Sequence, residues 1–353
     1  MKEIIFNNNN KTMTVPIIQG GMGVGVSLGN LAGHVAFNGG MGVISTAHPG
    51  YREEDFETNT LQANLRALKN EIKKAKDISQ GKGIVAINAM VAIKDYDAMI
   101  KASLQANVDA IISGAGLPLK LPQLVDGHDV LIAPIVSSGK AAKLILKYWM
   151  KKYHRCADFV VIEGSQAGGH LGFKKEDVIA HTVQSLEHIF QDVKKVVQEF
   201  EELFQKKIPV FVAGGIYTKE DIQKYLNIGV DGVQMATRFI TTYECDADVK
   251  YKEMFLKAKK EDIELVTSPV GMPGRAISNK LTETIKTQRI PVKKCYQCLI
   301  PCDVKTTPYC ISRALIEAVK GNIDEGLIFS GSNGYRNEKI VSVKELIDEL
   351  TGE

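Results

Sequence analysis

Eight short apolar runs rich in valine and isoleucine recur over about the first 240 residues, and they constrain the fold more than any other feature of the sequence. Each run ends in small or polar residues, and most are followed by a segment with helical spacing. Such runs are typical of strands buried on both faces, because crossover helices cover both sides of a parallel sheet. The predicted strands are Val15 to Met22, Gly40 to Thr46, Ile84 to Val91, Ala110 to Gly116, Val130 to Ser138, Phe159 to Glu163, Pro209 to Ile216 and Gly232 to Ile240.

Amphipathic helices are predicted between these strands. In the clearest one, apolar residues from Ile189 to Phe204 repeat at helical spacing while the opposite face is charged. Weaker patterns occupy Leu61 to Lys76, Tyr96 to Ala106 and Lys140 to Lys151. Eight alternations of strand and helix match the size of a closed TIM (β/α)8 barrel, and an open doubly wound sheet is the competing α/β architecture.

The positions of the glycines favour the barrel. The dinucleotide fingerprint Gly-x-Gly-x-x-Gly is absent from the sequence. Glycines cluster instead where the predicted strands end, at Gly20 and Gly21, Gly114 and Gly116, Gly168 and Gly169, and Gly214 and Gly215. In a TIM barrel, those carboxyl ends form the active face.

Three regions are predicted along the chain. Residues 1–242 form the barrel. The strand rhythm stops at about residue 243, so residues 243–334 are predicted to form a smaller helical lid or insertion, which contains a cluster of four cysteines. Residues 335–353 are predicted to pack back on the barrel as a C-terminal helix, because Ser342 with Glu345 three residues later is a typical capping pattern.

Composition and charge exclude several classes of protein. The 44 basic and 41 acidic residues are too balanced to give the positive field that nucleic-acid binding needs. The N-terminus is polar, with a run from Asn7 to Asn10, and no segment approaches the roughly 18 apolar residues of a membrane span. We therefore expect a cytoplasmic protein that binds neither nucleic acid nor membrane and keeps its cysteines reduced.

Two glycine loops near the end of the predicted barrel indicate a phosphate site. They are Val212 to Ile216, which contains Gly214 and Gly215, and Gly232 to Arg238. Glycines let a backbone approach closely, and exposed N–H groups at the ends of the last two strands of a barrel can bind a phosphate. The pattern alone does not say which phosphate compound binds.

The segment Glu163 to Gly172 is the most specific candidate site. Its glycines lie at the end of the sixth predicted strand, where they would allow a flat ring system to lie against the backbone. His170 lies between Gly169 and Leu171 at this barrel mouth. A histidine that titrates near neutrality is suited to abstracting a proton from a weak carbon acid.

Five motifs in order give the chain a family resemblance. They are Pro16-Ile-Ile-Gln-Gly-Gly-Met22, Ala167-Gly-Gly-His-Leu-Gly172, Ala213-Gly-Gly-Ile216, Gly232-Val-Gln-Met-Ala-Thr-Arg-Phe239 and Gly271-Met-Pro-Gly-Arg-Ala-Ile-Ser-Asn279. With them the chain resembles the nitronate monooxygenases, also called 2-nitropropane dioxygenases, over about residues 15 to 280. Flavin-type enoyl-ACP reductases share most of these motifs. One departure is Gln166, where family members commonly have glutamate.

The resemblance implies a TIM barrel that holds FMN without a covalent bond. His170 would be the catalytic base, which deprotonates a nitroalkane or stabilises the anionic nitronate before molecular oxygen completes the reaction. The implied flavin-binding residues are Gly21, Met22, Asn88, Gly168 and Gly169 around the ring, and Gly214, Gly215, Gln234, Met235 and Thr237 at the phosphate and ribityl end. Asn88 could equally be a strand-end cap. Family membership makes a homodimer plausible.

The cysteine cluster lies outside the family motifs. Cys295, Cys298, Cys302 and Cys310 have the spacing C-x2-C-x3-C-x7-C, which could ligate an iron–sulfur cluster or zinc. Four reduced, partly buried thiols that hold no metal are the alternative, and we favour it.

The leading hypothesis is FMN-dependent oxidation of alkyl nitronates by oxygen. An NAD(P)H-dependent flavin reductase that acts on an enoyl-ACP, another enoyl thioester or a quinone is the alternative on the same scaffold. A barrel that binds phosphate without flavin, such as an isomerase or aldolase, is a third possibility. The sequence does not name the physiological substrate.

Overall fold

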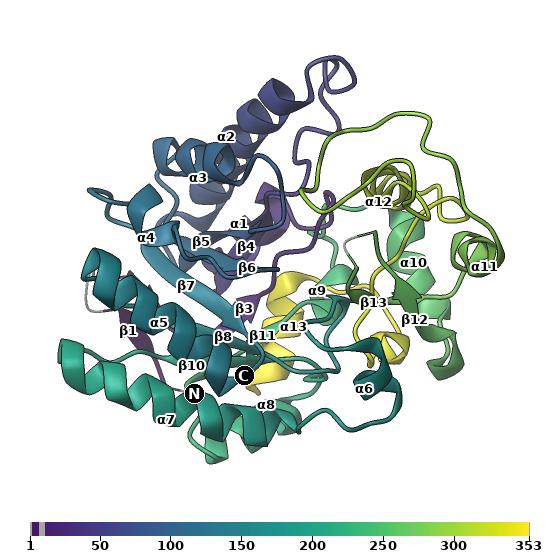
Figure 1. Cartoon of the computed structure of the whole chain (residues 1–353). Helices are drawn as coiled ribbons and strands as arrows, with labels where there is room; N and C mark the ends of the chain where they lie inside the picture. Colours follow the sequence, from purple (N-terminus) through teal and green to yellow (C-terminus); the bar gives the residue numbers. More distant parts are fainter. Residues whose placement is uncertain (1, 7–10, 270, 353) are drawn as a thin grey trace.

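Eight parallel strands form a closed barrel in the computed structural model, which describes residues 2–6, 11–269 and 271–352 (Figure 1). The asparagine run at 7–10 therefore lies outside the described residues. The barrel strands, in order around the barrel, are β3 (Ile17–Gln19), β4 (Met41–Ser45), β5 (Ile84–Met90), β6 (Ala110–Gly114), β7 (Leu131–Val136), β8 (Val160–Glu163), β10 (Val210–Ala213) and β11 (Gly232–Met235). The TIM barrel predicted from the sequence is confirmed.

The barrel closes between its first and last strands. Residues 233–235 of β11 pair in parallel with residues 17–19 of β3, and every neighbouring pair around the barrel is parallel. Each predicted apolar run contains one of these strands. The eighth run, however, is a strand only up to Met235, because the chain turns at Ala236 into the short helix α9 (Thr237–Ile240).

Helices cover the outside of the barrel at the places that the sequence periodicity predicts. The four predicted helices are α2 (Thr60–Ser79), α3 (Tyr96–Gln105), α5 (Gly139–Tyr153) and α7 (Leu186–Phe204). The apolar stripe of α7 is buried from Leu186 to Phe200, whereas Leu203 near the end of the helix is exposed. Ser185 caps this helix by accepting a hydrogen bond from the His188 backbone N–H. The remaining outer helices are α1 (Gly29–Phe37), α4 (Leu121–Leu124) and α8 (Lys219–Asn227).

Apolar side chains fill the barrel interior, and a hairpin closes the end of the barrel at which the strands begin. The hairpin consists of β1 (Ile4–Phe6) and β2 (Lys11–Met13). Phe6 packs against Phe159 with ring centroids 5.5 Å apart, and Phe159 packs against Phe211 at 5.6 Å. This end of the interior is therefore filled, and the opposite end, where the strands have their carboxyl termini, is the one expected to carry a site.

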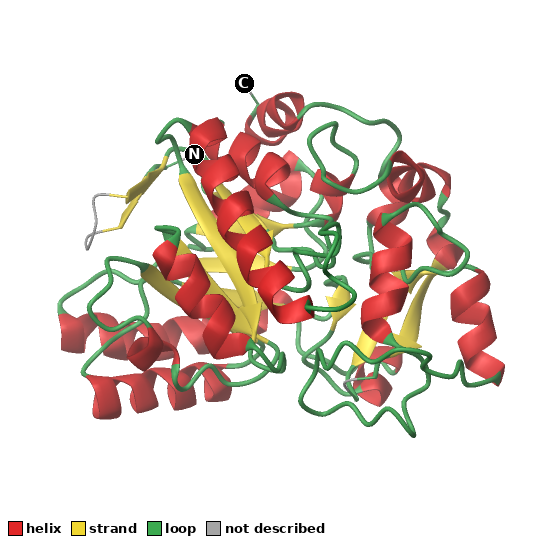
Figure 2. Cartoon of the chain, turned by 90° about the horizontal axis from the view of Figure 1, so that it is seen from above, coloured by secondary structure: helices red, strands yellow, loops and turns green. Residues whose placement is uncertain are grey.

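A second, smaller sheet lies beside the barrel mouth (Figures 1 and 2). It is antiparallel, in the order β12 (Ile263–Thr267), β13 (Pro273–Ile277) and β9 (Gly169–His170). The sequence indicated only helices after residue 243, and this expectation is wrong for β12 and β13. Their sequences, Ile-Glu-Leu-Val-Thr and Pro-Gly-Arg-Ala-Ile, show neither a continuous apolar run nor strict alternation of apolar and polar residues. The helical elements around the sheet are α6 (Lys175–Ile179), α10 (Val249–Lys257), η1 (Lys260–Asp262), α11 (Lys280–Thr287) and α12 (Ile311–Val319).

The chain ends on the barrel. A short helix, η2 (Gly334–Arg336), precedes α13 (Val343–Thr351), which contacts α1, α8 and α9. Ser342 and Glu345 form a capping box at the start of α13, as the sequence pattern predicts. No helix among the described residues is both long and apolar enough to cross a bilayer.

Candidate active site

A cavity of about 390 Å³, which we call the main cavity, lies at the carboxyl ends of the barrel strands. Its wall includes eight of the residues predicted from the sequence to form the site: Gly21, Met22, Asn88, Gly168, Gly169, His170, Gln234 and Thr237. These residues come from four separate segments of the chain. The fold therefore brings together residues that are more than 200 positions apart in the sequence.

Glycines let the segments of the wall approach each other closely. A Cβ atom on Gly21 would lie 2.5 Å from the Asn88 Cβ, and one on Gly168 would lie 2.5 Å from the Gly331 backbone nitrogen. Gly169 has a positive φ of 72°, and a Cβ there would have only the Phe329 ring nearby, at 3.8 Å. Much of the wall near His170 is therefore bare backbone.

His170 lies on β9, where it pairs with Gly274 of β13. Its Nε2 is 2.6 Å from the Ser268 Oγ, and its ring packs edge-on against Phe329 with centroids 5.1 Å apart. Burial lowers the pKa of His170 to about 4. From the sequence, His170 was expected to titrate near neutrality. Its pKa is lower because the surrounding residues exclude the water that would stabilise the imidazolium form. The ring is neutral at pH 7.

A buried arginine holds the loop that carries His170. Arg275, on β13, donates from Nη1 to the backbone oxygens of Ser165 and Ala167. Burial lowers the pKa of Arg275. In the sequence, this arginine was visible only as part of a motif and had no predicted role. Its hydrogen bonds join the second sheet to the loop between β8 and β9.

Glu163 is a further titratable group on the wall of the main cavity, at the carboxyl end of β8. Burial raises its pKa to about 7, so its carboxyl group is partly protonated near neutral pH. The sequence analysis named Glu163 only as the start of a segment. Its position as the last residue of a buried apolar strand was the available signal.

Three of the predicted site residues lie outside the wall of the main cavity. Gly214 and Gly215 have φ angles of 105° and 80° and pack against the loop 164–167, where a Cβ on Gly215 would lie 2.2 Å from the Gln166 Oε1. Met235 is buried in the core with 3% of its surface exposed. These residues shape the structure behind the wall.

A glycine- and serine-rich segment, residues 330–334, contributes Ser330 and Gly331 to the wall. The backbone N–H of Gly331 donates to the Thr237 Oγ1 at 3.1 Å, and the Asn333 Nδ2 donates to the Gly215 oxygen at 2.7 Å. The sequence analysis missed this segment. Its composition, Ser-Gly-Ser-Asn-Gly, is typical of a backbone that can approach a ligand closely, and it was a usable signal.

All four clustered cysteines are free thiols. Within residues 2–6, 11–269 and 271–352, no three His, Cys, Asp or Glu side chains are arranged to hold a metal ion. Cys295 is exposed, whereas Cys298, Cys302 and Cys310 are half-buried. The C-x2-C-x3-C-x7-C spacing therefore does not correspond to a preformed ligand set here.

Comparison with known proteins identifies relatives of this chain. The family model described as nitronate monooxygenase matches residues 7–353. A probable nitronate monooxygenase from Bacillus subtilis is 24% identical over 367 residues, which cover 97% of this chain and 96% of that protein.

Two solved structures have a similar fold. FabK from Thermotoga maritima superposes with a TM-score of 0.70 at 22% identity, covering 96% of this chain and 92% of FabK. A nitroalkane oxidase from Streptomyces ansochromogenes superposes with a TM-score of 0.70 at 19% identity, covering 97% of this chain and 96% of the oxidase. At these identities, the likenesses support the fold alone.

Proposed function

Because the chain belongs to the nitronate monooxygenase family of oxidoreductases, we propose that it oxidises alkyl nitronates with bound FMN and molecular oxygen. The observation that carries the proposal is the arrangement of the neutral imidazole of His170 beside a glycine-lined cavity of about 390 Å³. A small nitroalkane fits such a site, since its conversion to the nitronate needs a proton acceptor, and both forms need a flat, partly apolar surface.

The residues around the main cavity fit FMN. Bare backbone at Gly21, Gly168 and Gly169 leaves room for a planar ring, and Asn88 can offer an amide to it. Gln234 and Thr237 are the proposed contacts for the ribityl and phosphate end. Gly214 and Gly215 support that end from behind the wall, and Met235 supports it from the core.

FMN, when bound, supplies the electron acceptor and the centre at which oxygen is reduced. The protein supplies proton transfer and orientation. His170 is neutral at pH 7, so it can accept a proton from the carbon next to a nitro group. The contact between its Nε2 and the Ser268 Oγ fixes the plane of the ring, and Phe329 packs against one edge. An anionic nitronate would stabilise the imidazolium that forms.

The test is an absorbance spectrum of the purified protein, followed by separate anaerobic additions of ethylnitronate and NADPH. We expect the bands of bound oxidised flavin, which ethylnitronate changes rapidly and NADPH does not. Rapid bleaching by NADPH alone would replace the proposal with an NAD(P)H-dependent reductase. A colourless protein that binds no added FMN would overturn the flavin-dependent reaction altogether.

A further inference from the structure

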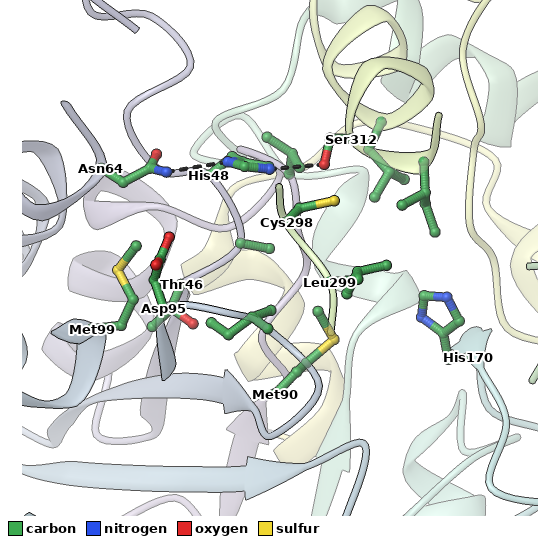
Figure 3. A pocket seen from close by; sticks show the side chains of 15 residues that line it. Thr46, His48, Asn64, Met90, Asp95, Met99, His170, Cys298, Leu299 and Ser312 are labelled. Atoms are coloured by element: carbon green, nitrogen blue, oxygen red, sulfur yellow. Dashed lines mark hydrogen bonds between the residues drawn. The ribbon is translucent and has the colours of Figure 1, made fainter. Parts of the chain in front are cut away.

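A second cavity of about 50 Å³, lined at one end by His170 (Figure 3), shares part of its wall with the main cavity. We call it the side chamber. The two cavities share Ala47, Met90, His170 and Leu315 in their walls. Figure 3 shows His170 at one end of the side chamber and Met99, from α3, at the other. The side chamber therefore leads away from the proposed proton acceptor.

The wall of the side chamber is mainly apolar. Its apolar members include Val24, Met90, Ile93, Met99, Leu299 and Leu315. Met99 has 2% of its surface exposed and Leu299 has 9%. Cys298 also lines the chamber, and because burial raises the pKa of its thiol to about 11, it is neutral and packs as a small apolar group.

A segment far along the chain forms one side of the chamber. Residues 298–300 run antiparallel to residues 92–94, with a bridge between Ile93 and Leu299. The Lys94 N–H donates to the Cys298 oxygen at 3.0 Å, and the Ile300 N–H donates to the Ala92 oxygen at 2.9 Å. This side of the chamber is thus held by backbone hydrogen bonds to the barrel.

The polar side chains of the chamber are paired with one another. His48 Nδ1 accepts from the Asn64 Nδ2 at 3.1 Å, because the Asn64 Oδ1 already accepts from the Gly50 N–H. The His48 Nε2–H therefore donates to the Ser312 Oγ, at 2.8 Å. Thr46 donates its hydroxyl to the Asn88 oxygen at 3.0 Å. These groups need no partner from a guest molecule.

One charged side chain, Asp95, also lines the chamber. It is half-buried and belongs to the end of the chamber near Met99 (Figure 3). A carboxylate that keeps some contact with water tolerates an apolar neighbour, because it is not fully desolvated. The chamber therefore offers a mostly apolar channel that begins at His170.

From this geometry, we infer that the side chamber binds the unbranched alkyl chain of the substrate, with the reacting carbon at His170 and the chain end near Met99. The inference rests on the proposed function, since it assumes that the reacting carbon lies beside His170. It specifies the substrate class as straight-chain alkyl nitronates of medium length. A cyclic substituent needs more room, since a cavity that binds benzene has about 150 Å³, against about 50 Å³ here.

The volume sets the chain length. One water-sized sphere needs about 10–15 Å³ of such space, so a cavity of this size holds roughly four methylene-sized groups in a row. Each methylene moved from water into an apolar site tightens binding about fourfold. Affinity should therefore rise with chain length and then stop rising when the chamber is full.

Straight-chain carboxylates test the inference without turnover, because a carboxylate has the planar, anionic, two-oxygen shape of a nitronate. We would measure the dissociation constants of propanoate through nonanoate by calorimetry on the flavin-loaded protein. The expected result is an approximately fourfold gain for each added carbon up to about hexanoate, followed by a plateau.

Two substitutions at the end of the chamber should move the plateau in opposite directions. Met99→Ala lengthens the chamber, so the gain should continue for one or two further carbons. Met99→Phe shortens it, so the plateau should come earlier. The matched control is Leu104→Ala, which removes a buried apolar side chain from the same helix outside the chamber wall. It should leave the plateau unchanged, and thermal unfolding would confirm that all three variants fold.

Affinity that does not depend on chain length would overturn the inference, as would a shift of the plateau by Leu104→Ala equal to that by Met99→Ala. If Met99→Phe does not fold, Met99→Ala still decides the question. Carboxylate binding and nitronate oxidation are independent results. A chain-length series without any reaction with ethylnitronate supports the chamber and refutes the proposed reaction, and the reverse result refutes the chamber alone.

Discussion

At the residue scale, the environment of His170 determines which proton transfers the site can perform. Its imidazole is neutral at pH 7 because burial lowers its pKa to about 4. A neutral ring can accept a proton, but the resulting imidazolium is stable only while an anion lies beside it. The site is thus suited to a substrate that becomes an anion when it loses its proton.

Replacing the base should separate two kinds of substrate. With His170→Asn, we expect bound flavin to be retained and the rate with neutral nitroalkanes to fall by about 10²- to 10⁴-fold, which is the usual contribution of a general base. Preformed nitronates need no deprotonation, so their rate should fall much less. Stopped-flow measurement of flavin reduction with each substrate is the test, with His181→Asn, an exposed position, as the control. An equal fall for both substrates would refute the role as base.

The other buried histidine, His48, should make the stability of the protein depend on pH. Its pKa is about 4 in the folded state because of burial, against 6.5 for the free side chain. Between about pH 4 and pH 6.5, the unfolded chain therefore binds a proton at His48 that the folded chain does not bind. The stabilisation is complete above about pH 6.5 and is lost progressively as the pH falls towards 4. Between pH 6.5 and pH 5, this one residue should lower the free energy of unfolding by about 2 kcal/mol.

The measurement is urea denaturation of the wild type and of His48→Gln at pH 7 and at pH 5. The variant lacks the titrating group, so its free energy of unfolding should change less between the two pH values, by about 2 kcal/mol. His181→Gln, in an exposed position, should behave like the wild type. A wild-type pH dependence that is unchanged in His48→Gln would contradict this reading of the buried ring.

The sequence could single out His170 as a candidate, but it could not predict its surroundings. The glycines on its N-terminal side and its place at the end of a predicted strand were visible as a local pattern. The contact with Ser268, 98 positions away, and the packing of Phe329 depend on the second sheet and on a distant segment. Desolvation follows from such contacts, so the pKa could not be predicted from local sequence. The same holds for Glu163, whose pKa depends on its burial in the barrel mouth.

At the element scale, the second sheet positions the loop that carries the site. Strand β13 pairs with β12 on one side and with the two-residue strand β9 on the other. Arg275 adds hydrogen bonds from β13 to the Ser165 and Ala167 oxygens. The loop before His170 is therefore fixed by an element that lies about 100 residues later in the chain.

Removing the guanidinium should loosen this loop. With Arg275→Met, two carbonyl oxygens lose their donor, and each unsatisfied group costs about 1–3 kcal/mol. We expect the free energy of unfolding to fall by about 2–5 kcal/mol and FMN to dissociate more readily. Chemical denaturation and flavin retained after ultrafiltration are the measurements. Arg313→Met, in an exposed position on α12, should change neither. Unchanged stability and flavin retention in Arg275→Met would show that the loop does not depend on this residue.

The contrast between the barrel strands and the second sheet shows why one was predictable and the other was not. The barrel strands are covered on both faces, so they read as continuous runs of valine and isoleucine. The sequence Ile263 to Thr267 contains two polar residues, Glu264 and Thr267, and it neither alternates strictly nor forms a continuous apolar run. Strand β9 has only two residues and exists because β13 pairs with it. A strand of this kind cannot be predicted from the local sequence.

At the scale of the whole molecule, the C-terminal segment completes the barrel. Val341 pairs with Thr242 just after α9, and the N–H of Val341 donates to the Thr241 oxygen. Helix α13 then contacts α1 and α8, which flank the strands where the barrel closes. Its inner face is buried and consists of Val343, Leu346, Ile347 and Leu350. The capping pattern predicted this helix, but the surface on which it packs depends on how the barrel closes.

Removal of α13 should therefore unfold the protein rather than leave a shorter folded barrel. Burying one such side chain contributes about 1.5–3 kcal/mol, so the four together contribute on the order of the 5–15 kcal/mol that stabilises a whole domain. A chain that ends at Val341 should be insoluble or lack the circular dichroism of the folded barrel.

A milder change, Leu346→Ala, should lower the free energy of unfolding by about 2–5 kcal/mol in chemical denaturation, because it leaves a cavity at a fully buried position. Lys344→Ala, on the exposed face of the same helix, should change stability by less than about 0.5 kcal/mol. If the truncated chain folds and binds FMN with normal stability, α13 is an appendage and the barrel is complete without it.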